Sequence, residues 1–333
     1  IGSAGGSGAK PHVDWCLSII EEIVRECHLR FHLAVIYADF DRQTVLDALI
    51  EGKVSPLGPA PILTPEVLQN TKRIVGQMGY EPLVEALKSG AQVILAGRAY
   101  DPAVFAAPAI LAGFDKGLAI HLGKILECAS ICAVPGSGSD CMIGYLGDDY
   151  FRVEPLNPSR KCTIVSVSAH TLYEKTNPYY LPGPGGQLDL TRAAFNQENE
   201  TTVRVKGSKY LTANKYTIKL EGAMRIGFRT VSIAGTRDPV MISQIEKIID
   251  GVRERVADNF AKKQIKYGLN FVIYGKNGVM GQLEPVTHTL SHELGIVIDA
   301  VSDTQEHSDT ICAFARSTML HYGYEGRRAT AGN

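Results

Sequence analysis

The chain has 333 residues, a formal net charge of −1, and a composition that is 45% apolar and 21% charged. This balance argues against nucleic acid or an anionic membrane as a partner, because both attract proteins with a basic excess. No apolar run is long enough to span a bilayer, and the length is sufficient for two domains. The seven cysteines form no CxxC pair and no zinc-finger spacing, which predicts reduced thiols and a cytoplasmic location.

The first elements have the outline of a βαβ unit. A glycine-rich loop at 2–8 precedes a predicted helix that begins near Pro11, and a predicted strand at 31–37 ends before Asp39. An acid at this place holds a ribose hydroxyl in dinucleotide-binding proteins, but the glycines do not follow GxGxxG, so the cofactor stays unknown. Bare backbone before a helix readily binds phosphate or carboxylate. We therefore predict an anion-binding loop with contacts from Gly5, Gly6 and Ser7.

The segment 40–90 is predicted to be mainly helical, and a buried parallel strand is predicted at 91–97. This strand delivers Arg98 to its carboxyl end, and Asp101 is the expected N-cap of the next helix. Ligands of open α/β sheets lie outside the carboxyl ends of the strands, so Arg98 is placed to bind an anionic substrate. The alternative is an arginine that is bonded to a neighbouring loop.

A further helix is predicted over 121–132. It carries His121, Glu127 and Cys128, which could be drawn as metal ligands. Their spacing matches no zinc pattern, so structural roles are favoured and no metal ligand is assigned.

The main candidate site lies in the stretch 162–190. A β-branched run at 162–167 predicts a strand, and 169–175 predicts a short helix. Within that helix His170 and Glu174 are spaced i,i+4, so both would project from one face. Histidine titrates near neutral pH, which favours a role in proton transfer, although such a pair is also common on solvated helices.

A glycine-rich loop and a third ionisable residue follow in the same stretch. The loop at 183–186 has bare backbone that a ligand can approach, and an acid stands just beyond it. The candidate residues there are Gly185, Gly186 and Asp189.

Strands dominate the remaining chain. They are predicted at 150–153, 201–205, 216–221, 225–234, 270–274 and 294–300. Helices are predicted after Asp238 and over 303–321. The chain thus changes from alternating helices and strands to a strand-rich pattern. This change predicts a mostly parallel sheet flanked by helices in an α/β domain at 1–147, and a second, α+β domain at 148–333.

Several segments together resemble the acyclic terpene utilisation (AtuA-type) family. They are GSAGGSG, ILAGRAYDPA, HLGKILEC, SVSAHTLYE, GPGGQLDL, VRVKGS, KLEGA, RTVSIAGTRDP and GRRATAGN. The resemblance runs from end to end, and members of the family continue on both sides, which suits the interpretation of this chain as a fragment. It implies a setting in the catabolism of acyclic terpenes, which proceeds through acyl-CoA thioesters. It supplies no catalytic residue.

The predicted function is general acid/base catalysis on a small carboxylate or acyl-CoA thioester, of the hydratase, isomerase or lyase type. His170 would carry the proton, Glu174 or Asp189 would orient it, and Arg98 would hold the anionic end of the substrate. One alternative is a non-catalytic subunit or scaffold of a catabolic complex. Another is a metal-assisted enzyme with His170, Glu174 and Asp189 as ligands. We expect a homo-oligomer, and we expect the candidate residues to line one pocket.

Overall fold

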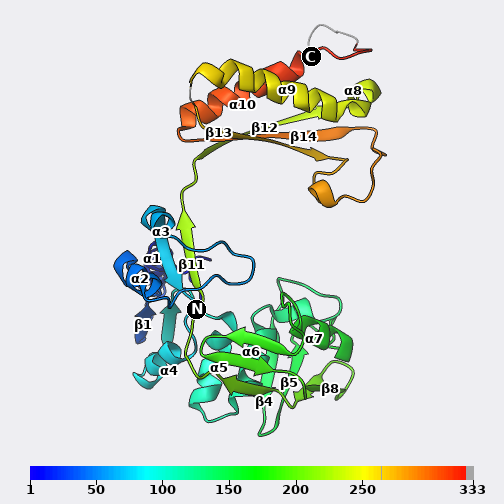
Figure 1. Cartoon of the computed structure of the whole chain (residues 1–333). Coiled ribbons are helices and arrows are strands. Elements are labelled where there is room, and N and C mark those ends of the chain that lie inside the picture. The colour runs from blue at the N-terminus through cyan, green and yellow to red at the C-terminus, as the bar shows by residue number, and fades with distance from the viewer. Residues whose placement is uncertain (264, 328–333) are drawn as a thin grey trace. The chain divides into compact units, whose positions relative to one another are not determined.

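The computed structural model describes residues 1–263 and 265–327, and the chain divides into two compact units (Figure 1). Unit 1 is Ile1–Met224 and unit 2 is Arg225–Asn333. The predicted domain boundary at 147/148 lies inside unit 1.

Unit 1 begins with two short sheets and their helices. The helices are α1 (Lys10–Glu26), α2 (Arg42–Ile50), α3 (Pro65–Asn70) and α4 (Glu81–Lys88), and the strands are β1 (Leu33–Ile36), β2 (Thr71–Gly76) and β3 (Val93–Ala96). β1 and β3 pair in parallel. The start of the chain lies along β3, where the amide of Ala96 donates to the carbonyl of Ile1 (2.8 Å) and the amide of Ser3 donates to the carbonyl of Gly97 (2.9 Å). The segments 1–7, 31–37 and 91–97 therefore meet, although the first is not a regular strand.

The strand β2 lies within the segment that the sequence predicted to be helical. It pairs antiparallel with β11 (Leu220–Met224), which comes from the far end of unit 1. Because its partner is so distant in sequence, β2 has no local turn or hairpin signal that could identify it.

The rest of unit 1 combines two buried helices with small antiparallel sheets. The helices are α5 (Asp101–Leu111) and α6 (Lys116–Leu126), with a 3-10 turn η1 (Ala129–Cys132). One sheet has the order β4-β5-β9-β8, from β4 (Met142–Leu146), β5 (Tyr150–Pro155), β8 (Ala194–Gln197) and β9 (Val203–Lys206). The other has the order β10-β7-β6, from β6 (Tyr180–Gly183), β7 (Gly186–Asp189) and β10 (Lys209–Thr212). The helix α6 packs between them, and its side chains are buried from Gly117 to Ile125.

The predicted mostly parallel sheet is wrong. Among the described residues β1 and β3 form the one parallel pair, and the other four sheets are antiparallel. Short connections explain this, because hairpins such as β4–β5 and β6–β7 can only join antiparallel strands, whereas parallel strands need a long crossover.

The predicted strand at 162–167 is also wrong, because this run belongs to α7 (Ile164–Thr171). A capping box starts the helix: Thr163 accepts from the amide of Ser166 at 3.0 Å, and the Ser166 hydroxyl accepts from the amide of Thr163 at 3.0 Å. Two satisfied amides outweigh the modest β-propensity of the branched residues. The helix ends at Thr171, so His170 and Glu174 do not share a helix face.

Unit 2 is a three-stranded antiparallel sheet with helices on one face (Figure 1). Its elements are β12 (Phe228–Thr236), α8 (Pro239–Ser243), α9 (Ile245–Phe260), the 3-10 turn η2 (Ala261–Lys263), β13 (Tyr267–Tyr274), the 3-10 turn η3 (Gly281–Leu283), β14 (Leu294–Ser302) and α10 (Gln305–Leu320). The strand order is β12-β14-β13, so β14 separates two parallel strands in a split β-α-β arrangement. As predicted, Asp238 caps the helix that follows it, accepting from the amide of Val240 at 3.0 Å.

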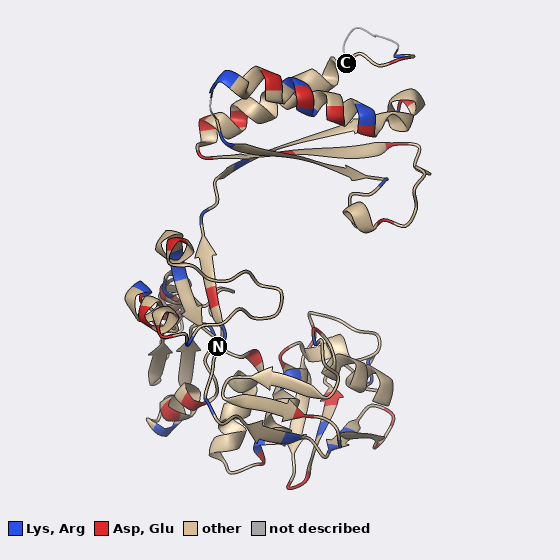
Figure 2. Cartoon of the chain, in the orientation of Figure 1, with Lys and Arg blue, Asp and Glu red and all other residues tan. Residues whose placement is uncertain are grey.

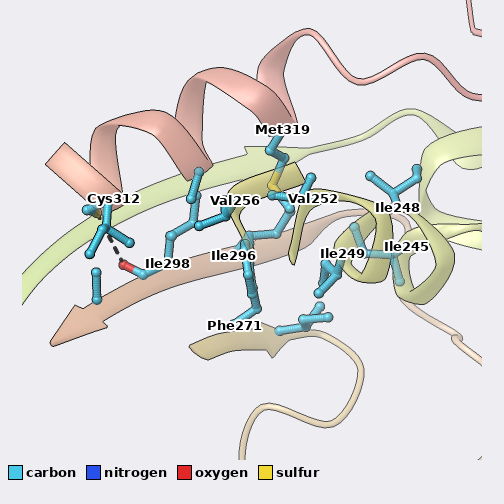
Figure 3. Close-up of a cluster of buried hydrophobic side chains, with 14 of the residues drawn as sticks. Ile245, Ile248, Ile249, Val252, Val256, Phe271, Ile296, Ile298, Cys312 and Met319 are labelled. Carbon is cyan, nitrogen blue, oxygen red and sulfur yellow. Dashed lines mark hydrogen bonds between the residues drawn. The ribbon is translucent and has the colours of Figure 1, made fainter. Parts of the chain in front are cut away.

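A continuous apolar core holds unit 2 together. Figure 3 shows Ile296 and Ile298 of β14 among side chains of α9 and α10. The charged residues of α9 and α10 are exposed, and few charged residues lie on the sheet (Figure 2). No helix in the described ranges combines the length and the apolarity that a membrane crossing needs.

Candidate functional site

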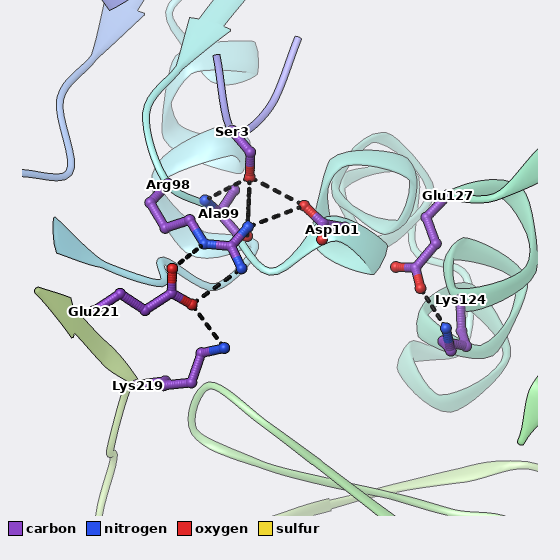
Figure 4. Close-up of polar contacts among 8 residues, drawn as sticks. All are labelled: Ser3, Arg98, Ala99, Asp101, Lys124, Glu127, Lys219 and Glu221. Atoms are coloured by element: carbon purple, nitrogen blue, oxygen red, sulfur yellow. Dashed lines mark hydrogen bonds and ion pairs between the residues drawn. The ribbon is translucent and has the colours of Figure 1, made fainter. Parts of the chain in front are cut away.

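The side chain of Arg98 is held by unit 1 itself. It follows β3, as predicted, and donates from Nε to Glu221 Oε2 (2.9 Å) and from Nη2 to Glu221 Oε1 (3.1 Å) (Figure 4). Nη1 donates to Ser3 Oγ (2.9 Å), and that hydroxyl donates to Asp101 Oδ1 (3.0 Å). Lys219 Nζ completes this Arg98 network at 2.7 Å from Glu221. The guanidinium fork that was predicted to hold a substrate anion therefore binds a carboxylate of the chain.

The glycine-rich loop at 2–8 allows close packing beside Arg98. A Cβ on Gly8 would lie 2.1 Å from the backbone nitrogen of Arg98, and one on Gly5 would lie 2.6 Å from the Cβ of His12. Ser7 Oγ is 2.7 Å from Nδ1 of the same histidine, whereas a Cβ on Gly6 would meet nothing within 4 Å. Local packing against His12 thus explains a glycine at position 5 and a serine at position 7, whereas there is free space beside Gly6.

The N-terminus of α1 already has an anionic partner. The amide of Lys10 donates to Asp39 Oδ2 at 2.8 Å. A carboxylate is the group that a helix N-terminus attracts, so Asp39 fills the place where the sequence predicted a ligand anion.

A second group of ionisable side chains surrounds Lys124, and we call it the Lys124 cluster. Its members are Tyr100, Lys124, Glu127, His170, Tyr173, Glu174 and Lys175. Lys124 lies on α6 with a side chain only 2% exposed, and its ammonium pairs with Glu127 one turn later (Figure 4). Burial raises the pKa of Glu127, and the contacts from Lys124 offset this only in part. This carboxyl can therefore hold a proton nearer to neutral pH than an exposed glutamate.

His170 is the member of the cluster with an incomplete hydrogen-bond set. Its ring is 5% exposed and stacks on Tyr173, with ring centroids 5.5 Å apart. Nε2 is buried and has no hydrogen-bond partner among the described residues. Burial and the charge of Lys124 lower the pKa of His170 to about 4, although Glu174 opposes this. The imidazole is therefore neutral at pH 7. The sequence assigned it the role of proton carrier because an ordinary histidine titrates near neutral pH, and this reason does not apply to His170.

Lys175 and Tyr100 close the cluster on the side of α5. The Nζ of Lys175 lies 5.9 Å from the ring centroid of Tyr100, which is the N-cap residue of α5 in place of the predicted Asp101. Burial and the charge of Lys124 lower the pKa of Lys175. Burial, Glu127 and other neighbours raise the pKa of the Tyr100 phenol. Glu174 has the left-handed φ of 59° just after α7 and acts electrostatically on both His170 and Lys175.

The hairpin β6–β7 serves packing at the positions that were predicted to bind substrate. A Cβ on Gly185 would lie 2.5 Å from the ring of Tyr216, and one on Gly186 would lie 2.3 Å from the carbonyl oxygen of Leu211. Asp189 accepts from the amide (2.8 Å) and the hydroxyl (2.6 Å) of Thr191, as in an Asx turn.

The hairpin approaches the cluster at Gly183, where a Cβ would lie 3.0 Å from the ring of Tyr100.

The structure therefore brings His170 and Glu174 together but places Arg98 in a different network. Asp101 links the two groups, because it lies 3.5 Å from Arg98 and acts electrostatically on Glu127. Two cavities, of about 370 Å³ beside α1 and about 1120 Å³ in unit 2, contain no predicted site residue in their linings. The single pocket that the sequence predicted stays a prediction.

His121 has the structural role that its spacing favoured. It is fully buried, with Nδ1 2.6 Å from Ser208 Oγ and Nε2 3.0 Å from Thr171 Oγ1. Burial lowers its pKa to about 3, so it is a neutral hydrogen-bonding residue of the core.

Sequence reasoning missed Lys124 and Lys175 as site residues, and it considered Glu127 only as a metal ligand, which it did not assign. One signal was present: α6 is apolar on all sides, so a lysine within it had to be buried. A buried lysine needs a carboxylate partner, and Glu127 stands three positions later. No local pattern identifies Lys175, because most of the groups around it, such as Tyr100, Lys124 and Lys219, are distant in sequence.

Comparison with known proteins identifies the family of the chain. No curated protein and no solved structure matches the chain. The family model described as "Acyclic terpene utilisation family protein AtuA" matches residues 6–136 and 157–330, which is most of the chain and confirms the resemblance found in the sequence. The chain belongs to the acyclic terpene utilisation family AtuA, and this membership indicates a role in acyclic terpene utilisation.

Proposed function

We propose that this chain is an enzyme that moves protons on a small carboxylate or acyl-CoA thioester during acyclic terpene utilisation. The observation that carries the proposal is the unpartnered Nε2 of His170 inside the Lys124 cluster. A buried polar atom without a hydrogen bond is destabilising, and a catalytic role, in which a substrate atom completes the bond, is one reason for such an atom to persist.

The cluster contains the groups that proton transfer needs. Glu127 is the proton carrier, because its pKa is raised toward neutrality. The ammonium of Lys124 stabilises the negative charge that develops on a substrate oxygen. His170, as a neutral imidazole, forms a hydrogen bond to the same oxygen through Nε2. This replaces the role of proton carrier that the sequence assigned to His170.

The Arg98 network is a scaffold for this site in the proposal. It fixes the start of α5 through Asp101, and α5 carries Tyr100 at its N-cap. We further propose a cytoplasmic homo-oligomer with a small anionic substrate and no nucleic acid or membrane partner. Light scattering of the protein at micromolar concentration tests the oligomer, and a monomer would contradict it.

The decisive experiment measures proton exchange. The protein is incubated in D₂O with a branched 2-enoyl-CoA thioester and, separately, with the corresponding free acid. Mass spectrometry should show deuterium on the substrate carbon skeleton, or a mass gain from hydration. Glu127→Gln should lower the rate by roughly 10²–10⁴-fold.

The control is Glu85→Gln, which changes an exposed glutamate of α4 and should leave the rate unchanged. Equal rates in the two variants would remove Glu127 from the mechanism. No exchange or hydration in the wild type would favour the alternative of a non-catalytic subunit.

A further inference from the structure

The strand β12 is an unprotected edge of the sheet in unit 2. Within the described ranges it pairs with β14 alone, so its outer side has no strand partner. Natural edge strands usually avoid further pairing by means of lysine, proline, a bulge or a short length. β12 contains neither lysine nor proline, and it pairs with β14 over nine residues without a register shift. Its outer backbone groups are therefore available to another strand.

The side chains of β12 are complementary to themselves. Ser232 lies opposite Ile298 of the core and faces the helices, whereas Val231 and Ile233 lie on the other face and are 45% and 79% exposed. In an antiparallel pair of two β12 strands centred on Ser232, Val231 of each copy lies opposite Ile233 of the other. Branched apolar residues in such cross-strand positions stabilise a sheet.

The helix α10 runs beside β12 in the same direction. Near its start, Asp309 accepts from the hydroxyl of Thr230 at 2.6 Å. Near its end, Arg316 faces the second half of β12 across a cavity of about 1120 Å³. From Thr230 to Ser232 the strand advances about 6.6 Å, which is about four residues of helix. The centre of β12 is therefore level with residues 312–313, the midpoint between Asp309 and Arg316.

Asp309 and Arg316 give this side of α10 complementary charges. Both are exposed, and their spacing of seven residues places them on one side of the helix. Asp309 is bound by the neutral side chains of Thr230 and Gln305, and in the part of the chain that the structure describes neither charge has an ion-pair partner. A two-fold axis through the midpoint would bring Asp309 of each copy opposite Arg316 of the other.

The spacing of the elements fits such a pair. α10 packs over both β12 and β14, so it lies slightly inside the edge of the sheet. If two sheets joined at β12 with strands about 4.8 Å apart, the axes of the two α10 helices would be about 10 Å apart, which is an ordinary distance between packed helices. The small side chain of Ala313 near the midpoint allows this approach.

We propose that two copies of this chain associate through β12. Their three-stranded sheets join into one sheet, and the two α10 helices pack against each other around the two-fold axis. The cavity beside β12 then receives the second copy. The inference rests on the homo-oligomer put forward with the proposed function and names its interface, but it does not use the proton transfer in unit 1.

A charge exchange tests the contact between the two α10 helices. In the full chain, Arg316→Asp should raise the dissociation constant of the dimer about tenfold or more, because carboxylates then face each other at both ends of the contact. Adding Asp309→Arg restores opposite charges and should recover most of the affinity. Lys247→Asp makes the same change of charge at an exposed position of α9 and should leave the affinity unchanged. Analytical ultracentrifugation measures the affinities, and circular dichroism checks the fold of each variant.

Disulfide crosslinking tests the register of the two strands. Chains that carry Val231→Cys are mixed with chains that carry Ile233→Cys and are oxidised mildly. Because position 231 of one copy lies opposite position 233 of the other, we expect dimers bonded between these positions in the mixture and not in either variant alone. Peptide mapping distinguishes this bond from bonds of the native cysteines. No bond between positions 231 and 233 in a dimeric mixture would contradict the register.

The outcomes separate this inference from the proposed function. A wild-type dimer whose affinity Arg316→Asp does not change overturns the β12 interface and leaves the homo-oligomer. A monomeric wild type removes both the interface and the homo-oligomer. Proton exchange by a monomeric wild type would still support the chemistry of the Lys124 cluster.

Discussion

Arg98 and Glu221 form a two-point ion pair, with Nε–Oε2 at 2.9 Å and Nη2–Oε1 at 3.1 Å, between residues 123 positions apart. The arginine side chain is 16% exposed and the glutamate side chain 34% exposed. Burial raises the pKa of Glu221, but hydrogen bonds from Arg98 and Lys219 outweigh it and hold the pKa below its ordinary value. The pair therefore stabilises unit 1 at neutral pH.

Replacing Arg98 by lysine should lower the stability of unit 1. A point charge cannot make the two parallel hydrogen bonds, so we expect the free energy of unfolding to fall by about 1–3 kcal/mol. Denaturant unfolding measures this, with Arg73→Lys on the exposed side of β2 as the control. Equal midpoints for the two variants would show that the fork contributes nothing. The difference should shrink on acidification, because the stabilisation is present above the ordinary pKa of Glu221 and is lost as the pH falls through its lowered pKa.

His170 should make the protein sensitive to acid. Its pKa falls from 6.5 to about 4 on folding, so the unfolded state binds more protons between these values and stability falls as the pH falls. The loss should reach roughly 2–3 kcal/mol near pH 4 and be absent above pH 7. His170→Gln should remove this part of the slope, and His32→Gln, at an exposed position, should not. Part of the slope that remains in His170→Gln should belong to His121, which is also buried and neutral, and part to carboxylates with a lowered pKa such as Glu221.

Removing one member of the buried pair of Lys124 and Glu127 should destabilise the protein strongly, whereas replacing both members by apolar residues should destabilise it little. Lys124→Met or Glu127→Leu alone leaves a charge without its partner and should cost about 3–5 kcal/mol. The double variant removes both charges and should recover most of that loss. Chemical denaturation of the four proteins gives the coupling energy. Additive losses would mean that the two side chains do not depend on each other.

Gly186 should be intolerant of a side chain for a reason unrelated to substrate. A Cβ there would lie 2.3 Å from a backbone oxygen of β10, so Gly186→Ala should lower the free energy of unfolding by roughly 1–3 kcal/mol. Gly138→Ala is the matched control, because nothing lies within 4 Å of its Cβ position. A Gly186→Ala protein with normal stability and impaired substrate binding would instead support the role that the sequence predicted.

The sequence predicted those features that depend on neighbouring residues. The helix that begins near Pro11, the position of Arg98 after β3 and the Asp238 cap are local, and each is present in the structure. The family was also evident, because its motifs are short and keep their order.

Features that depend on distant residues were not predictable in this way. No residue close to Arg98 in the sequence indicates that Glu221 is its partner. Likewise, no residue close to Lys175 indicates its contact with the ring of Tyr100. The run at 162–167 was misassigned because branched residues suit a strand, while the deciding hydrogen bonds of Thr163 and Ser166 suit a helix. Parallel pairing was overestimated because helices and strands alternate along the chain, which is typical of βαβ units. Most of these helices do not connect two parallel strands that pair in one sheet.

The pairing of β2 with β11 has a consequence for synthesis. A ribosome that has made the first two hundred residues has not yet made the strand that covers β2 or the carboxylate that binds Arg98. Until then the emerging chain exposes an unpaired strand edge, which is a site for aggregation or for chaperone binding. Because these contacts span most of unit 1, its folding will be slow compared with that of helical bundles of the same size.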